Sequence, residues 1–237
     1  MLVSGKQKVT ENIWNRGGLD SCVEFLQSLD LKKHSINLYK TPFRVLFQKI
    51  IDGNVDPNFF WKNTDDIKKV LTAFNPKTRT LNIGSRSVVL TEDFIRDLLG
   101  IVDGKSFIDI KSGQKITNVK FTERNYPEHY VKKTMKLTKA MIEARLKEQN
   151  KAKSGVNSND FAANTILYLL AEGLLPNKAE NIGWKYIDFV TDFEKSVKFN
   201  WSKRIFHSLL TVDVGEETHS GCLQILLVRI ILVGFMI

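Results

Sequence analysis

The chain has 237 residues, a formal net charge of +9 and a hydrophobic content of 43%. It holds only 5 Pro and 14 Gly against 15 Phe, so its composition excludes a low-complexity or disordered chain and supplies a hydrophobic core. The length favours one domain over residues 1–237. The excess of positive charge favours a polyanionic partner, either nucleic acid or an acidic protein surface.

The first third of the chain predicts three amphipathic helices. Asp20 is expected to cap the first, Thr41 and Pro42 to begin the second, and Asn75-Pro76 to end the third. Their apolar stripes, at three- and four-residue spacing, are Val23, Phe25, Leu26 and Leu29, then Phe43, Leu46, Phe47, Ile50 and Ile51, then Ile67, Val70, Leu71 and Phe74.

The next segment changes from helical to strand periodicity. Leu81 and Ile83 alternate with polar residues up to Gly84-Ser85, and the β-branched Val88 and Val89 follow, which predicts a small β-hairpin near residues 80–90. Thr91 is placed to cap a following helix that Gly100 ends. Residues 102–130 have no clear periodicity and carry scattered Gly, Lys and Asn, which predicts a long loop that is the most mobile stretch of the chain.

A lysine-rich helix follows and is the main candidate for function. An apolar stripe made of Leu137, Met141, Ile142 and Leu146 predicts that one face packs. Clustered cations attract phosphates through counterion release, so the other face is a candidate polyanion-binding surface. The alternative is an ordinary solvated helix face. The candidate polyanion-binding residues are Lys132, Lys133, Lys136, Lys139, Arg145 and Lys147.

The second half predicts further helices and completes the fold class. Helical stripes run from Asp160 to Gly173, from Trp184 to Lys195 and from Asn200 to Leu210, and the first of these is expected to be central to the core. The sequence therefore predicts a mostly α fold, a helical globular domain with a small β-hairpin.

The apolar C-terminal segment, residues 222–237, has two interpretations. It is shorter than the roughly 20 residues that span a bilayer, and Arg229 stands in its middle. A buried final helix is favoured, and membrane association through this tail is kept as the alternative. The N-terminus lacks the apolar run of a secretory signal, which favours a nuclear or cytoplasmic location.

A search for chemistry nominates no catalytic, cofactor-binding or metal-binding residue. Cys22 and Cys222 stand far apart without the spacing of a metal knuckle, and packing in the core is the favoured role for both. No phosphate-binding glycine loop is present. Acidic pairs such as Asp65-Asp66 are adjacent, so on a helix they diverge and cannot share one proton-transfer site. We therefore expect a protein that is not an enzyme and needs no cofactor.

Landmarks spread along the chain resemble the plant mobile domain family, whose members are often labelled aminotransferase-like and whose relatives occur in transposons and beside SUMO-type cysteine protease domains. The landmarks, in order, are Val9–Gly18, Thr41–Phe43, Val89–Phe94, Leu98–Ile101, Leu167–Leu170, Leu174–Lys178, Gly183–Asp192, Phe199–Trp201 and Ser220–Leu223. Together they extend over residues 9–224.

The resemblance implies a nuclear, transposon-related helical domain without established chemistry. It marks Trp184, Asn200, Trp201, Gly221 and Cys222 as structural positions, and no lysine stands in a pyridoxal-phosphate motif. The family pattern continues beyond Cys222 with a Trp-containing helix and polar sequence, which this chain lacks, so we expect a C-terminally truncated domain. The expected function is a non-catalytic interaction domain that binds nucleic acid or a chromatin partner. The alternative is an accessory domain of a transposon-derived protein whose protease or transferase domain is missing.

Overall fold

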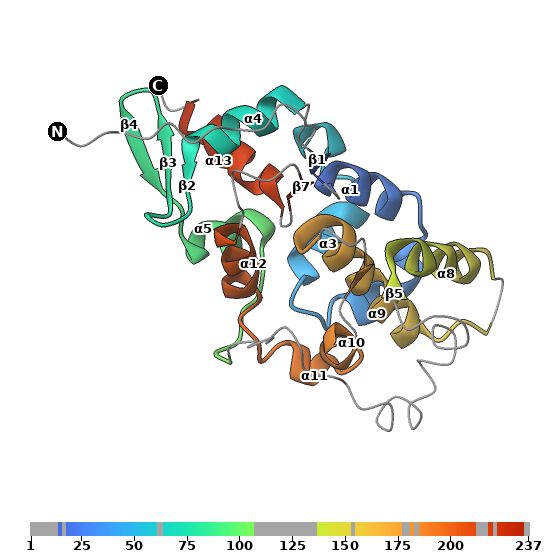
Figure 1. Cartoon of the computed structure of the whole chain (residues 1–237). Helices are drawn as coiled ribbons and strands as arrows, with labels where there is room; N and C mark the ends of the chain where they lie inside the picture. Colours follow the sequence, from blue (N-terminus) through green and yellow to red (C-terminus); the bar gives the residue numbers. More distant parts are fainter. Residues whose placement is uncertain are drawn as a thin grey trace.

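The computed structural model describes residues 14–15, 18–60, 64–106, 137–152, 155–176, 181–182, 185–211, 218–219 and 222–234. Within them the fold is mostly helical with a small antiparallel sheet, as the sequence predicts. The sheet and helix α13 lie at one end of the molecule and α8 lies at the other (Figure 1).

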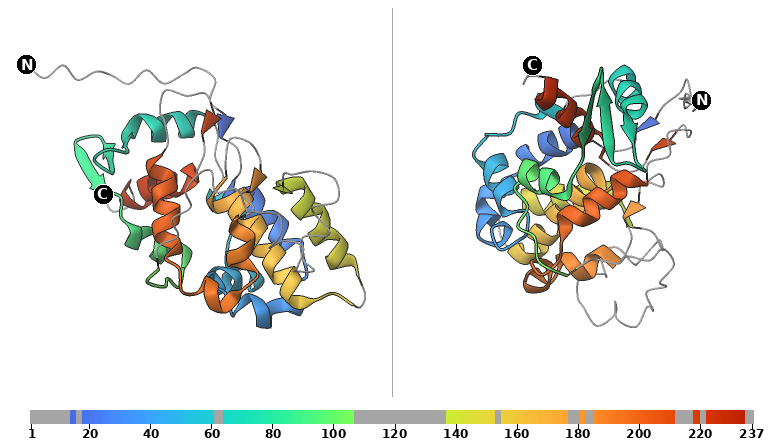
Figure 2. Two further views of the ribbon diagram at one scale, coloured as in Figure 1. Left: turned by 60° about the horizontal axis from the view of Figure 1, so that its bottom comes forward. Right: turned by 90° about the vertical axis from the view of Figure 1, so that its left-hand side faces the viewer.

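The N-terminal helices are α1 (Leu19–Gln27), the 3₁₀ turn η1 (Leu31–His34), α2 (Ser35–Leu38), α3 (Arg44–Ile51), the 3₁₀ turn η2 (Pro57–Phe60), α4 (Thr64–Ala73) and α5 (Glu92–Leu99). The C-terminal helices are α8 (Lys139–Lys151), α9 (Ser158–Tyr168), the π-helical turn η3 (Leu169–Leu174), α10 (Lys185–Val190), α11 (Phe193–Ser196), α12 (Trp201–Leu210) and α13 (Leu223–Gly234). Helices α8 and α10 pack against α9, and the turned views in Figure 2 show these three together.

The predicted hairpin is confirmed and gains a third strand. Strands β3 (Thr80–Ile83) and β4 (Arg86–Val89) pair around the two-residue turn Gly84-Ser85. The extra strand, β2 (Phe74–Asn75), pairs with β3 on its other side because the chain leaves α4 in an extended conformation. Short strand pairs also form between β1 (Trp14–Asn15) and β7 (Thr218–His219), and between β5 (Leu137–Thr138) and β6 (Asn181–Ile182).

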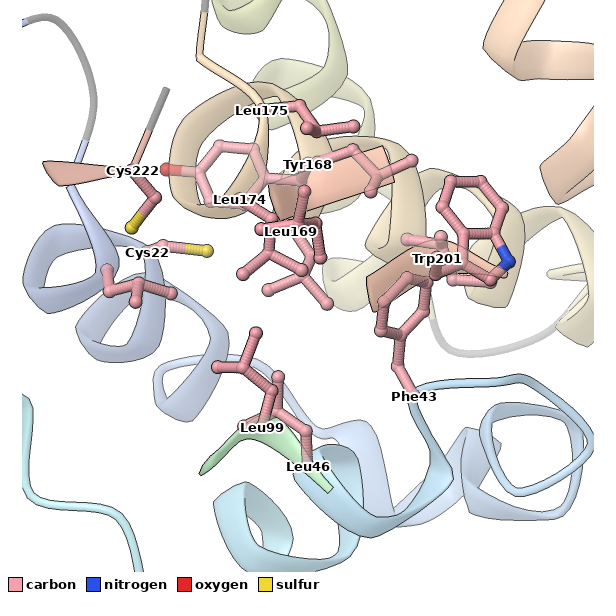
Figure 3. Close-up of a cluster of buried hydrophobic side chains, with 14 of the residues drawn as sticks. Cys22, Phe43, Leu46, Leu99, Tyr168, Leu169, Leu174, Leu175, Trp201 and Cys222 are labelled. Carbon is pink, nitrogen blue, oxygen red and sulfur yellow. The ribbon is translucent and has the colours of Figure 1, made fainter. Parts of the chain in front are cut away.

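The core is centred on α9 and η3, as predicted for the helix that begins near Asp160. Every residue of α9 from Phe161 to Tyr168 is buried, because α8 and α10 pack against it and α1 packs against the adjoining η3. Figure 3 shows Tyr168, Leu169 and Leu174 in one buried cluster with side chains from distant elements, among them Phe43 and Trp201. Burial of this much apolar surface is the main source of stability for the fold.

Helix ends test the predicted caps. Thr91 and Gly100 act as predicted: the Thr91 hydroxyl accepts the Phe94 N–H at 3.1 Å, and Gly100 takes the left-handed conformation at φ 62°. The prediction for Asp20 is wrong, because this residue stands in the first turn of α1 after Gly18. The prediction for Thr41 is also wrong, because its hydroxyl donates to the Leu38 carbonyl and α3 begins only at Arg44.

The helix predicted from Trp184 to Lys195 is divided into α10 and α11. Asp192 separates them, because its carboxylate accepts the Lys195 N–H at 2.9 Å and so caps the second helix. The helix predicted from Asn200 is confirmed as α12.

The beginning of the predicted long loop is fixed by backbone hydrogen bonds. Gly104 N–H donates to the Phe199 carbonyl at 2.8 Å, and Ser106 both donates to the Lys198 carbonyl and accepts from Asn200 N–H. A side chain at Gly104 would collide with the Lys198 backbone. The rest of that loop, residues 107–130, lies outside the described residues.

The final helix, α13, is buried as the sequence favours. Leu223, Ile225 and Leu226 are fully buried, and the helix packs against α4. Gln224 attaches it to the start of α1, because its carboxamide accepts the Leu19 N–H at 2.6 Å and donates to Asp20 and to the Phe60 carbonyl at 2.8 Å each. None of the described helices combines the length and the apolar character needed to cross a membrane.

Candidate polyanion-binding surfaces

Helix α8 buries its apolar stripe and turns its cations away from the core. Thr138 caps it by accepting the Met141 N–H at 3.3 Å, and Ile142 and Leu146 are fully buried where the helix packs against α9. Figure 2 shows α8 at the edge of the molecule, beside α9. We call Lys139, Arg145 and Lys147, with the preceding Lys132, Lys133 and Lys136, the α8 cationic face. Its first three members in sequence, Lys132, Lys133 and Lys136, lie outside the described residues.

The described cations of the α8 cationic face all have acidic neighbours. Arg145 pairs with Glu148 at 2.8 Å, and Lys147 pairs with Glu143 one turn away. These are short-range pairs within one helix at a partly solvated surface, where an ion pair contributes only about 0–1 kcal/mol. A phosphate group can therefore compete for the same cations.

Lys139 differs from the other two because its partner is buried. Its ammonium lies 2.8 Å from the Glu172 carboxylate, whose side chain is only 6% exposed. The Ser21 hydroxyl donates a second bond to Glu172 at 2.9 Å. Lys139 is thus the counter-ion of a buried carboxylate in η3, a structural role that competes with ligand binding.

A pocket of about 230 Å³ lies at the C-terminal end of α8. It is lined by polar side chains, among them Arg145, Glu148 and Asp160. The volume is below the roughly 300–1,000 Å³ of typical small-molecule sites, and the lining lacks the apolar surface such sites have. The pocket therefore suits solvent better than a cofactor.

A second group of cations gathers on α12, which the sequence alone does not single out. Lys203, Arg204 and His207 are half-buried on one side of this helix, whereas Trp201, Ile205, Phe206 and Leu209 enter the core on the other. Arg79, from the turn between β2 and β3, places its guanidinium carbon 5.6 Å from the centre of the Phe206 ring. We call Arg79, Lys203, Arg204 and His207 the α12 cationic group.

Burial and three cations act in the same direction on His207, within the α12 cationic group. Burial, followed by the field of Lys203, lowers the pKa of His207, and Arg204 and Arg79 act in the same direction. Glu92, at the start of α5, acts in the opposite direction. Arg204 is held in place because its Nε donates to the Tyr186 hydroxyl at 3.2 Å.

The two cysteines occupy the core, as predicted. Both thiols are buried, and Figure 3 shows them near each other, one on α1 and one on the residue before α13. Burial, with the nearby Glu172 carboxylate, raises the pKa of the Cys22 thiol well above its usual value. Because the thiolate is the nucleophile, this environment keeps Cys22 unreactive.

Histidines and metal-binding side chains give no further centre among the described residues. His34 stacks on Phe161 with ring centres 4.0 Å apart, and its Nδ1 lies 3.0 Å from the Ser158 hydroxyl. The described part of the chain contains no group of three or more His, Cys, Asp or Glu side chains that could hold a metal ion.

Among the positions marked by the family resemblance, the described ones have structural roles. The Asn200 carboxamide caps α12 by accepting the Lys203 N–H at 2.7 Å. Trp201 is fully buried and its indole N–H donates to the Ser196 carbonyl at 3.0 Å. Cys222 is buried at the start of α13. Trp184 and Gly221 lie outside the described residues.

Comparisons with known proteins give one family assignment. No curated protein and no solved structure matches the chain. The family described as "Domain of unknown function (DUF8566)" matches residues 61–223, which include both α8 and α12. This match covers more than half of the chain, which therefore belongs to the DUF8566 family.

Proposed function

We propose that this protein is a non-catalytic interaction domain that binds nucleic acid through the α8 cationic face. The observation that carries the proposal is the division of α8 into a buried apolar side and an outward cationic side. The three lysines that precede the helix in sequence extend the same run of positive charge. The net charge of +9 and the resemblance to plant mobile domains are in line with a nuclear role.

Phosphate binding at this face depends on competition with the helix's own acids. Lys147 is 56% exposed and Lys151, one turn further, is exposed, so both can reach a polyanion. Pairing with Glu143 is too weak to prevent exchange, since exposed pairs of this kind contribute well under about 1 kcal/mol. Each phosphate that binds releases condensed counterions, which provides the driving force.

The test is the salt dependence of binding to a short DNA duplex and to a single strand of DNA, followed by fluorescence anisotropy. The variant, which we call the α8 variant, replaces five lysines by Gln: Lys132, Lys133, Lys136, Lys147 and Lys151. Lys139 is left unchanged because its replacement would leave buried Glu172 without its counter-ion. We expect the slope of log K against log salt to become less steep by about one for each phosphate that the variant no longer binds.

A matched control replaces five exposed lysines elsewhere by Gln, namely Lys32, Lys40, Lys49, Lys69 and Lys105. A control that weakens binding as much as the α8 variant would show that net charge alone matters and would contradict the proposed surface. Absence of DNA binding by the unchanged protein at low salt would also contradict it and would favour an acidic protein as the partner.

A further inference from the structure

The α12 cationic group is assembled from two segments that lie far apart in the sequence. Lys203, Arg204 and His207 come from one helix, and Arg79 comes from the β2–β3 turn. Helix α12 packs against α5, which follows the small sheet directly in the chain (Figure 1). The position of Arg79 over the Phe206 ring fixes the fourth member of the group to the other three.

The backbone at Arg79 is held in an unfavourable conformation. Its φ is 60°, the only positive value at a non-glycine residue in the described part of the chain. Two sets of hydrogen bonds maintain it: the Arg79 carbonyl accepts the Leu90 N–H at 2.8 Å, and the Asn75 carboxamide accepts the N–H groups of Lys77 and Thr78. A non-glycine residue in this region costs about 1 kcal/mol or more, and such strain clusters at functional sites.

Three cations and one acid of the described residues act on the pKa of His207. Lys203, Arg204 and Arg79 lower its pKa, and Glu92 raises it. Two other acids of α5, Asp93 and Asp97, are exposed and pair with Arg96 of the same helix, at 2.7 Å and 3.3 Å. Three cations from two segments, Arg79, Lys203 and Arg204, thus act on one half-buried imidazole.

We infer that the α12 cationic group is a second binding site, for the phosphodiester backbone of nucleic acid. Two of its members are arginines, whose planar guanidinium forks match the geometry of phosphate oxygens better than an ammonium does. Both guanidiniums are already oriented, Arg204 by its bond to Tyr186 and Arg79 by the Phe206 ring. Preorganised cations give up less side-chain entropy on binding.

This site extends the proposed function but does not depend on the α8 cationic face. Helices α8 and α12 lie well apart, on different sides of α9, in the views of Figures 1 and 2. The two surfaces can therefore be altered separately, and each can fail alone.

The test measures anisotropy of a labelled DNA duplex with the full chain and two triple variants of equal charge. The site variant carries Arg79→Gln, Lys203→Gln and Arg204→Gln. The control carries Lys32→Gln, Lys40→Gln and Lys49→Gln, three exposed lysines between η1 and α3. We expect the salt slope of the site variant to fall by up to about three, with affinity reduced about tenfold per phosphate, and the control to change far less.

Equal binding by the site variant and the control, with both thermal midpoints at the wild-type value, would overturn the inference. A second variant, Arg79→Lys with Arg204→Lys, keeps the charge and provides a test of the site if the first variant does not fold. An affinity between those of the wild type and the site variant supports bidentate binding of phosphate. Polyglutamate bound as tightly as DNA, with the same weakening in the site variant, would overturn the phosphate assignment. The α8 variant measured in parallel distinguishes failure of this site from failure of the proposed function.

Discussion

Helices α8 and α12 bury one side and present cations on the other, yet the two surfaces differ in where the surrounding charges come from. On α8 each described cation of the cationic face has a carboxylate within a salt-bridge distance, either on the same helix or on buried Glu172. On α12 the fold adds a further cation, Arg79, from another segment, and Arg79, Lys203 and Arg204 all lower the pKa of His207. A high density of lysines in a sequence is therefore a poorer guide to positive potential than the charges that the fold brings near.

The largest change in the free energy of unfolding is expected when Lys139, on α8, is replaced. Lys139→Met leaves the Glu172 carboxylate buried without its counter-ion, so we expect the free energy of unfolding to fall by about 3 kcal/mol. The matched change, Lys147→Met, removes a cation from a partly exposed Glu143 and should cost less than about 1 kcal/mol. Urea denaturation of both variants measures the difference.

Similar destabilisation in the two variants would mean that the pair between Lys139 and Glu172 is no stronger than a surface pair. Lys139 would then be available to bind a ligand, as the other cations of the α8 cationic face are. The expected difference would instead remove it from the α8 cationic face and leave the other five residues to carry the proposed binding.

The sequence predicts correctly those features that depend on local spacing. The apolar stripe is buried because residues three and four apart share a helix face; it consists of Phe43, Leu46, Phe47 and Ile50. Gly84-Ser85 forms the hairpin turn because two-residue hairpin turns favour a few residue types, glycine among them. Predictions that depend on tertiary partners are wrong, and some features of this kind are not predicted at all. Asp20 lies inside the first turn of α1 and is not its cap, and its carboxylate accepts a hydrogen bond from Gln224, a residue from the other end of the chain.

The α12 cationic group also depends on a tertiary contact that the sequence alone does not predict. Lys203, Arg204 and His207 are visible in the sequence as neighbours on a predicted helix. Nothing in the spacing of the chain places Arg79 beside them, because that proximity needs the packing of the β2–β3 turn against α12. The acids that weaken the α8 cationic face are partly visible in sequence as Glu143 and Glu148, but Glu172 is not.

A smaller effect is expected at Tyr186, which orients Arg204. Tyr186→Phe removes the hydroxyl that accepts the Arg204 Nε–H at 3.2 Å, so Arg204 gains freedom that it must give up on binding. We expect DNA affinity to fall by about two- to tenfold, the equivalent of about 0.5–1.5 kcal/mol. Tyr39→Phe is the control, since Tyr39 belongs to neither surface. Unchanged affinity in Tyr186→Phe would show that Arg204 does not need this bond to bind phosphate.

The smallest effect distinguishes the two surfaces by pH. Burial and the field of Lys203 lower the pKa of His207 below its usual value of 6.5, so its imidazole gains a charge only as pH falls below that value. A phosphodiester stays anionic over this range, and binding at α12 should therefore tighten with falling pH, with a salt slope steeper by about one. The charged groups that act on His207 are Lys203 and Arg204 on α12, Arg79 on the turn and Glu92 on α5.

Helix α8 contains no histidine, so its contribution should not follow this trend. His207→Gln should flatten the pH dependence, whereas the α8 variant should keep it. Stability moves in the opposite direction: the unfolded His207 has the higher pKa, so the stability that this residue contributes is present above about pH 6.5 and disappears as pH falls through the folded pKa. A pH dependence that survives in His207→Gln but vanishes in the α8 variant would assign DNA binding to α8 and not to α12.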